Sequence, residues 1–341
     1  MDSSNSTFSV KIVQTTIVSP ILLKAVIVVN FFVFTEAIGL FGIVANVVNI
    51  VNLRRQGFRD GFNITLTALA VSDLGILVTQ QIYIQIYNPW TDESLFAMLK
   101  SHMMLFVIYA NDYFVRVSGL ITSFGAFERC LCVVLPMKVK LVVTRKTSTF
   151  VNVSIFLVLI GYVVLPYSLM YVGWKYIPNE NKTIAYVFFK ENRNSIMNLF
   201  YIVAGIFLPY FTILMLLVFT VILISKLRSN SEWRQRVSTQ GRHAFRESDS
   251  VSYKERKVTA MLSAMSGLYV VCLLPHSALN LAMGLVDGMK IYGIYYDITT
   301  LAYTFVVLAE TVNCSLTPII YFKMSSKYRE ITLELLRCEK K

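Results

Sequence analysis

Charged residues are rare in the long apolar stretches of this 341-residue chain, so the few that occur there are the first candidates for chemistry. Asp73 lies in one such stretch, and Asp112 and Arg116 lie in another. An ionisable group in an apolar setting is costly, and it is usually paired or functional. Asp112 and Arg116 are four residues apart, so they share one face of a helix and can pair. A self-neutralised pair without a binding role is the alternative.

The composition indicates which elements position these residues. The chain is 55% hydrophobic and 15% charged, with a mean hydropathy of +0.59. A soluble domain carries about 25% charged residues. Charges this sparse cannot cover a soluble protein of this length, so lipid is the expected surroundings. The net charge of +12 does not indicate a nucleic-acid partner, because Lys and Arg crowd the segments between apolar runs.

Seven apolar runs are each long enough for a helix to cross a membrane. They are Ala25–Leu53, Phe62–Tyr87, Ser101–Val134, Thr149–Val172, Ile196–Ile224, Lys257–Val286 and Tyr296–Phe322. Backbone groups in lipid need internal partners, so the runs are predicted to be helices. The predicted fold is an all-α, seven-transmembrane bundle over residues 25–322, with a third inner loop at about 225–256. The first run is too long for the apolar core of a signal peptide, so it is predicted to be a span. Residues 1–24 are then predicted to be an extracellular N-terminus.

The distribution of positive charge orients the bundle. With the N-terminus outside, 23 of the 32 Lys and Arg fall in inner segments and 8 in outer ones. The glycosylation sequons at Asn5 and Asn181 then lie outside. Residues 323–341 form an inner tail, in which Lys323–Leu336 has the pattern of an amphipathic helix on the membrane surface. Cys338 follows that helix and is a candidate for palmitoylation.

Short motifs occur in a fixed order along the runs. They are Gly42–Asn46, Leu69–Leu74, Glu128–Cys130 with Pro136 seven residues after Arg129, Pro209, Cys272–Pro275 and Thr317–Tyr321. Together, over nearly the whole chain, they resemble the rhodopsin-like (class A) G-protein-coupled receptors. The segment ERCLCVVLPMKVK, from Glu128 to Lys140, is similar to the chemosensory receptor expansions of molluscs and related invertebrates.

The resemblance implies a chemosensory receptor in the plasma membrane that binds an extracellular small polar ligand or peptide and activates a heterotrimeric G protein. Arrestin and a receptor kinase are further implied partners. A polytopic secondary transporter is the alternative, but repeat symmetry and glycine-broken helices are not apparent. No enzymatic function is expected, since the chain has three His and neither an HExxH motif nor a P-loop.

The resemblance also implies a set of coupling residues. Arg129 would pair with Glu128, or it would pair with Glu255 and so hold the third and sixth spans together in the resting state. The alternative is that Arg129 only extends its guanidinium to the membrane surface. Pro275 would be the pivot of the sixth span. The other implied coupling positions are Pro136, Met137, Pro318 and Tyr321.

Two polar sites are implied inside the bundle. The first is an allosteric sodium site, the one cofactor considered, at Asp73, Ser118, Asn313 and Thr317; alternatively, Asp73 hydrogen-bonds Asn46 to pack helices. The second is a ligand site in the outer half, with Arg116 as its electrostatic centre and Asp112 as the resting partner. Its predicted residues are Asn111, Asp112, Arg116, His276, Asn280, Tyr303 and Glu310.

The chain departs from the resembled family in two respects. Met104 stands where most relatives have a cysteine, and the outer segment from Gly173 to Ser195 has none, so no outer disulfide is expected. Leu273 stands where many relatives have a switch tryptophan, which places that activation trigger in doubt.

Overall fold

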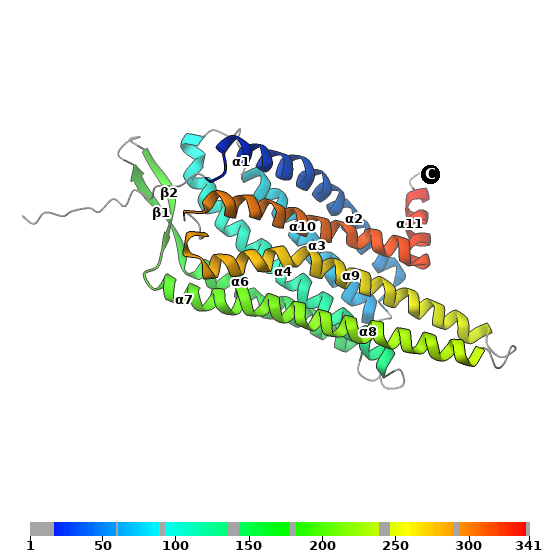
Figure 1. Ribbon diagram of the computed structural model, residues 1–341. Coiled ribbons are helices and arrows are strands. Elements are labelled where there is room, and N and C mark those ends of the chain that lie inside the picture. The colour runs from blue at the N-terminus through cyan, green and yellow to red at the C-terminus, as the bar shows by residue number, and fades with distance from the viewer. Residues whose placement is uncertain are drawn as a thin grey trace, which may run out of the picture.

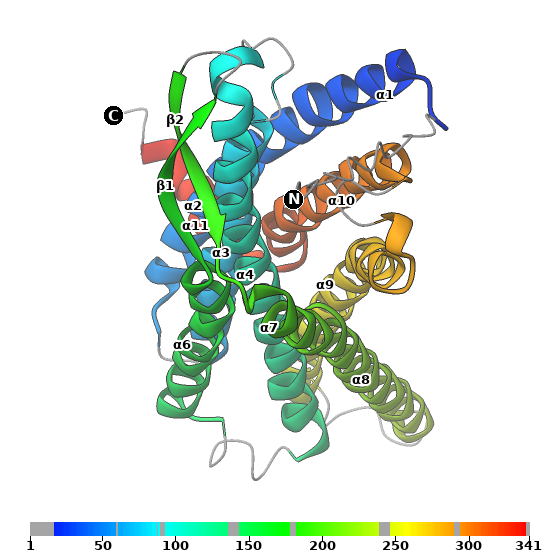
Figure 2. The same cartoon turned by 90° about the vertical axis from the view of Figure 1, so that its left-hand side faces the viewer.

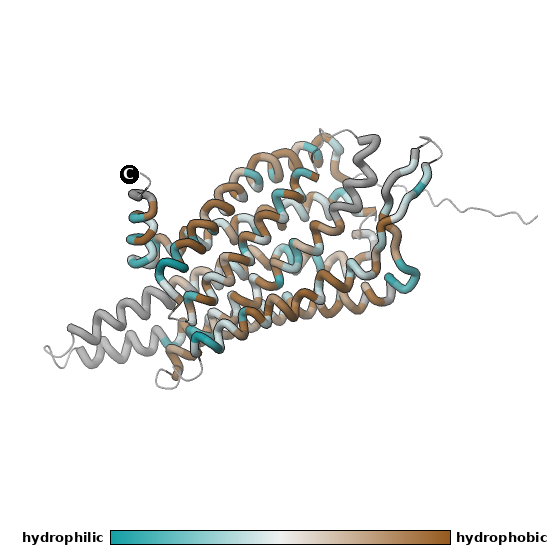
Figure 3. Tube along the Cα trace, turned by 180° about the vertical axis from the view of Figure 1, so that it is seen from behind, coloured by the Kyte–Doolittle hydropathy of each residue, from teal (hydrophilic) through white to brown (hydrophobic). Residues whose placement is uncertain are grey.

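Seven membrane-length apolar helices dominate the computed structural model, which describes residues 17–58, 61–86, 88, 93–135, 143–177, 182–238, 246–289 and 294–338. They lie side by side in one bundle (Figure 1). Hydrophobic residues follow most of their length (Figure 3), as expected for helices that face lipid. The predicted seven-transmembrane fold is confirmed.

The elements occur in a simple order along the chain. The first span consists of α1 (Pro20–Ile27), η1 (Val28–Thr35) and α2 (Glu36–Gln56), and the next three are α3 (Gly61–Ile86), α4 (Glu93–Val134) and α6 (Arg145–Ser168). Strands β1 (Met170–Ile177) and β2 (Lys182–Phe189) follow. The fifth span consists of α7 (Arg193–Phe200), η3 (Tyr201–Phe207) and α8 (Leu208–Ser238). The last helices are α9 (Arg246–Leu285), the short η4 (Asp287–Met289), α10 (Tyr296–Met324) and α11 (Ser326–Cys338).

Local sequence explains several helix ends. Ser19 caps α1, its hydroxyl accepting a hydrogen bond from the Leu22 amide, and Thr144 caps α6 in the same way. Gly57 ends α2 with a φ of 85°, a backbone conformation that residues with a Cβ rarely adopt. These signals place the turns that reverse the chain between successive spans.

Two stretches, η1 and η3, are π-helices rather than α-helices. The second lies immediately before the Leu208–Pro209 start of α8. A proline lacks an amide hydrogen and its ring crowds the carbonyl four residues earlier, so the wider turn accommodates Pro209. We have no comparable sequence explanation for η1.

The helix α4 lies at the centre of the bundle, where it packs against α3, α6, α8 and α9 (Figure 2). One end of the bundle carries β1 and β2 and is called the hairpin end. The opposite end carries α11 and is called the α11 end (Figure 1). The central position of α4 puts Asp112 and Arg116 inside the bundle and away from lipid.

The β-hairpin departs from the sequence prediction. The fourth run was predicted to stay helical to Val172, but α6 ends at Ser168 and β1 begins at Met170. Pro166 lies in the last turn of α6, and the amide of Leu169 closes that turn on the Pro166 carbonyl at 3.2 Å. The strands pair antiparallel, from Met170 opposite Phe189 to Ile177 opposite Lys182.

The predicted amphipathic helix is present as α11 and is anchored to the bundle. Asn52 of α2 donates a 2.7 Å hydrogen bond to the Thr332 hydroxyl, and both side chains are buried. The rings of Tyr321 and Tyr328 lie 5.9 Å apart, where α10 turns into α11. These contacts fix the position of α11 across the end of the bundle.

Candidate functional site

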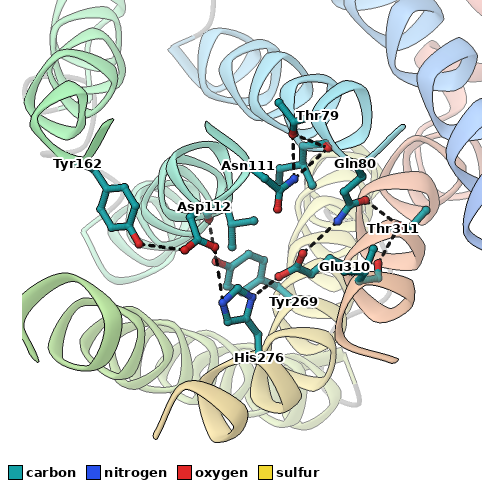
Figure 4. Close-up of polar contacts among 12 residues, drawn as sticks. Thr79, Gln80, Asn111, Asp112, Tyr162, Tyr269, His276, Glu310 and Thr311 are labelled. Carbon is teal, nitrogen blue, oxygen red and sulfur yellow. Dashed lines mark hydrogen bonds and ion pairs between the residues drawn. The ribbon is translucent and has the colours of Figure 1, made fainter. Parts of the chain in front are cut away.

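Three ionisable side chains from three helices converge in the hairpin half of the bundle (Figure 4). The imidazole of His276 on α9 lies between Glu310 on α10 and Asp112 on α4. Its Nδ1 makes a short contact with Glu310 Oε1, and its Nε2 lies 3.7 Å from Asp112 Oδ1. His276 and Glu310 are each 5% exposed, so water contributes little to balancing these charges. The arrangement joins three helices through one imidazole ring.

Uncharged side chains complete the network around these charges. Gln80 of α3 donates a 3.0 Å hydrogen bond to Glu310 Oε2, and its carbonyl oxygen accepts one of 2.7 Å from the Thr311 hydroxyl. On the other side, the Tyr162 hydroxyl of α6 donates to Asp112 Oδ2 at 3.1 Å. Hydrogen bonds to buried charged groups are stronger than those between neutral groups. The network therefore holds α3, α4, α6, α9 and α10 in one arrangement.

Arg116 is buried one turn further along α4 from Asp112, with 3% of its surface exposed. None of its three side-chain nitrogens makes a hydrogen bond of ordinary geometry to a residue that the structure describes, and the Tyr162 hydroxyl is the group that interacts most strongly with its charge. Tyr162, Asp112 and Tyr269 are the groups that act on its charge. The Asp112 carboxylate is directed to Tyr162 and His276 and acts on the charge of Arg116 without a direct hydrogen bond, so its role as the resting partner stays a prediction.

Three other predicted ligand residues lie at the edges of this network. Asn111 donates to the Thr79 hydroxyl at 2.8 Å and to the Ile76 carbonyl at 3.1 Å, which ties α4 to α3. The Asn280 backbone carbonyl accepts a hydrogen bond from the Tyr201 hydroxyl. Tyr303 packs edge-on against Tyr83, with 5.7 Å between ring centres. These contacts are compatible with walls of a site as well as with helix packing.

The sequence interpretation missed Gln80, Thr311, Tyr162 and Tyr269. A glutamine inside an apolar run was a signal for Gln80, since lipid tolerates its amide poorly. Thr311 gave no signal, because a threonine can satisfy its hydroxyl on its own helix. Tyr162 and Tyr269 gave none either, since a tyrosine in an apolar run is most simply a core residue.

The predicted sodium site is only partly assembled. Asp73 is 1% exposed, and its Oδ1 accepts a 2.8 Å hydrogen bond from the Ser118 hydroxyl. Its Oδ2 has no hydrogen-bond partner among the residues that the structure describes. Thr317 instead donates to the Asn313 carbonyl. Asn46 donates to the carbonyls of Gly42 and Cys314, which does not support the alternative that it pairs with Asp73.

At the α11 end, the predicted coupling residues have distinct surroundings. Glu128 is 1% exposed and accepts a hydrogen bond from the Ser148 hydroxyl on α6. The Arg129 guanidinium lies over the Phe62 ring, 3.5 Å from its centre, in a cation–π contact. Glu255 belongs to α9, but its side chain lies outside the described residues, as do Pro136 and Met137. The predicted Arg129–Glu255 pair stays a prediction.

The helix-breaking residues lie where they can act on the bundle. Pro275 and Pro318 lie inside α9 and α10, and Tyr321 is buried beneath α11. Each proline removes one backbone hydrogen bond, which weakens the helix locally. Because Pro275 directly precedes His276, the network is attached to α9 beside the proline.

Covalent features are described only in part. Cys130, Cys132, Cys272 and Cys314 form no disulfide with one another. The sequons at Asn5 and Asn181 and the Cys338 side chain lie outside the described residues. Glycosylation and palmitoylation at these positions stay predictions.

A family comparison now identifies the chain. Residues 29–339 match the family described as serpentine type 7TM GPCR chemoreceptor Srw. The chain belongs to this Srw family of chemoreceptors. No curated protein matches it. The receptor is thus a multi-pass membrane protein with a chemosensory role, as the resemblance implied, and the family match does not extend to the rhodopsin-like subtype.

Proposed function

We propose that this Srw receptor binds an extracellular ligand at the hairpin end and activates a heterotrimeric G protein at the α11 end. The observation that carries the proposal is the attachment of His276, beside Pro275, to Glu310 and Asp112. A ligand that changes these contacts alters the forces on α9 at its proline. Outward motion of the inner part of α9 then opens a cavity for a G protein.

The two ends of the receptor are connected by α4. Asp112 and Arg129 are 17 residues apart on this helix, or about 25 Å at the α-helical rise. That separation puts the ligand network and the Arg129–Phe62 contact in opposite halves of a membrane about 30 Å thick. The excess of Lys and Arg in the segments at the α11 end supports a cytoplasmic location for that end in the plasma membrane.

A sodium ion fits the chemistry of the Asp73 region, where Oδ2 is buried and lacks a hydrogen-bond partner among the described residues. Asp73 and Ser118 would hold the ion, and it would supply the positive charge that this carboxylate lacks. The Thr317 hydroxyl is bonded instead to the backbone carbonyl of Asn313 on its own helix. Sodium would stabilise the resting packing of α3 against α4 and so oppose activation.

The proposed function is tested by expressing the receptor with a promiscuous G protein and a panel of small polar compounds and short peptides. We expect at least one compound to accelerate nucleotide exchange. The variant Arg129→Gln, expressed at equal surface density, should abolish the response because it alters the coupling end alone. Compound-driven solute flux without nucleotide exchange would instead show a transporter.

A further inference from the structure

The guanidinium of Arg116 is buried beside this network without a carboxylate bonded to it in the described part of the chain. It is 3% exposed, and its Nε and both terminal nitrogens make no hydrogen bond with the described part of the chain. A guanidinium carries five N–H donors and stays charged at every physiological pH. Buried charges in proteins are nearly always paired, so a persistent unpaired one indicates a missing partner.

The nearby carboxylates are already engaged. Asp112 accepts the Tyr162 hydroxyl and faces His276, while Glu310 accepts from Gln80 and contacts the same imidazole. Both ring nitrogens of His276 face carboxylate oxygens. The two carboxylates are thereby directed to His276, Tyr162 and Gln80, and within the described part of the chain neither makes an ion pair with Arg116.

A small cavity borders the network at Glu310. Tyr269, Cys272, Leu273, Glu310, Asn313 and Cys314 contribute to its wall. Tyr269 is also one of the groups that act on the charge of Arg116. Tyr269 thus has Glu310 beside it in the cavity wall and interacts electrostatically with both Glu310 and Arg116, so groups of opposite charge lie around one ring.

We propose that Arg116 binds the carboxylate of a small zwitterionic ligand of the amino-acid class, whose ammonium group is received by Asp112 and Glu310. The inference rests on the proposed function and names its ligand. A carboxylate can accept two parallel N–H bonds from a guanidinium. A zwitterion adds no net charge inside the membrane, whereas a simple anion or amine would add one.

The first test needs no ligand. Arg116→Met keeps a long side chain of similar volume and removes the unpaired charge. We expect the full-length receptor in lipid nanodiscs to keep or raise its Tm, because binding groups are commonly held at the expense of stability. A Tm lower than wild type by about 5 °C or more would show that Arg116 is part of a structural ion pair and would overturn the proposal.

The second test uses pooled L-amino acids as probes on the same nanodiscs. At a hundredfold excess over Kd we expect the wild-type Tm to rise by about 5 °C. The matching decarboxylated amines and N-acetyl amino acids, which each lack one charge, should leave Tm unchanged. Arg116→Met should abolish the shift. Arg116→Lys should weaken binding by about tenfold or more, because an ammonium cannot form the bidentate contact.

Arg193→Met is the matched control, since Arg193 lies at the same end but packs on Phe189, 4.0 Å from the ring centre. It should keep the amino-acid shift. Equal shifts from amines alone, or no shift from any amino-acid pool, would overturn the zwitterion proposal. Nucleotide exchange stimulated by a compound without a carboxylate would overturn it too, while leaving the proposed receptor function intact.

Discussion

Replacing Gln80 by Leu removes two hydrogen bonds that join α3 to α10 in the hairpin half of the receptor. The bond from Gln80 to Glu310 is 3.0 Å long, and the bond from Thr311 to Gln80 is 2.7 Å long. A bond to a charged group contributes about 1.5–3 kcal/mol. A bond between neutral side chains inside a membrane averages about 0.6 kcal/mol. Gln80 is 2% exposed, so water cannot replace either partner.

The burial of an apolar Leu offsets part of this loss, which leaves an expected destabilisation of about 2 kcal/mol. For a protein larger than 250 residues this corresponds to a decrease in Tm of about 4 °C or less. Thermal unfolding of the purified receptor in nanodiscs measures it directly. A double-mutant cycle with Thr311→Val should give a coupling energy of about 0.6 kcal/mol for the neutral bond.

The next residue provides a matched control. Gln81 lies on the same helix, but its side-chain nitrogen has no hydrogen-bond partner among the residues that the structure describes. Gln81→Leu should therefore leave Tm unchanged or raise it. If Gln80→Leu and Gln81→Leu shift Tm equally, the network around Glu310 does not hold α3 to α10 and the reasoning fails.

Three further predictions concern coupling and covalent structure. Phe62→Leu removes the ring under Arg129, a contact that contributes about 1 kcal/mol. Basal nucleotide exchange should therefore rise by about fivefold. An unchanged basal rate would show that the contact does not restrain Arg129. Glu255→Ala should also raise basal signalling at equal surface expression, and a lower basal rate would contradict the lock. With Met104 in α4 and no cysteine from Gly173 to Ser195, thiol labelling of the denatured, depalmitoylated receptor should give the same count before and after reduction. Additional thiols after reduction would reveal a disulfide.

The fold could be predicted from the sequence because its main signal is physical. Runs of apolar residues must be helices in lipid, whatever their side chains touch. The β-hairpin could not be predicted by the same signal, because Leu169–Val172 is apolar and suits either a strand or a helix. Pro166 and Gly173 flank the point where the chain changes conformation, and they were the available sequence indication.

Several residues of the candidate site could be predicted from the sequence, but the groups that they contact could not. The spacing of Asp112 and Arg116 shows that they share a helix face, and it says nothing of competing groups on other helices. His276 and Tyr162 come from α9 and α6, far away in the sequence, and they engage Asp112 instead. Gln80 and Thr311 became part of the site only through the packing of α3 against α10.

The π-helical turn η3 bears on how this receptor should be aligned with its relatives. A π-helix fits about one extra residue into a turn, so residues 201–207 hold a local insertion within an otherwise regular span. Deleting one codon there would rotate α7 by roughly 100° relative to α8. Every side chain of α7 would then face a new direction, while Pro209 and the rest of α8 kept their orientation. Diversification of ligand preference could thus proceed by single-residue insertions and deletions that leave the coupling half untouched.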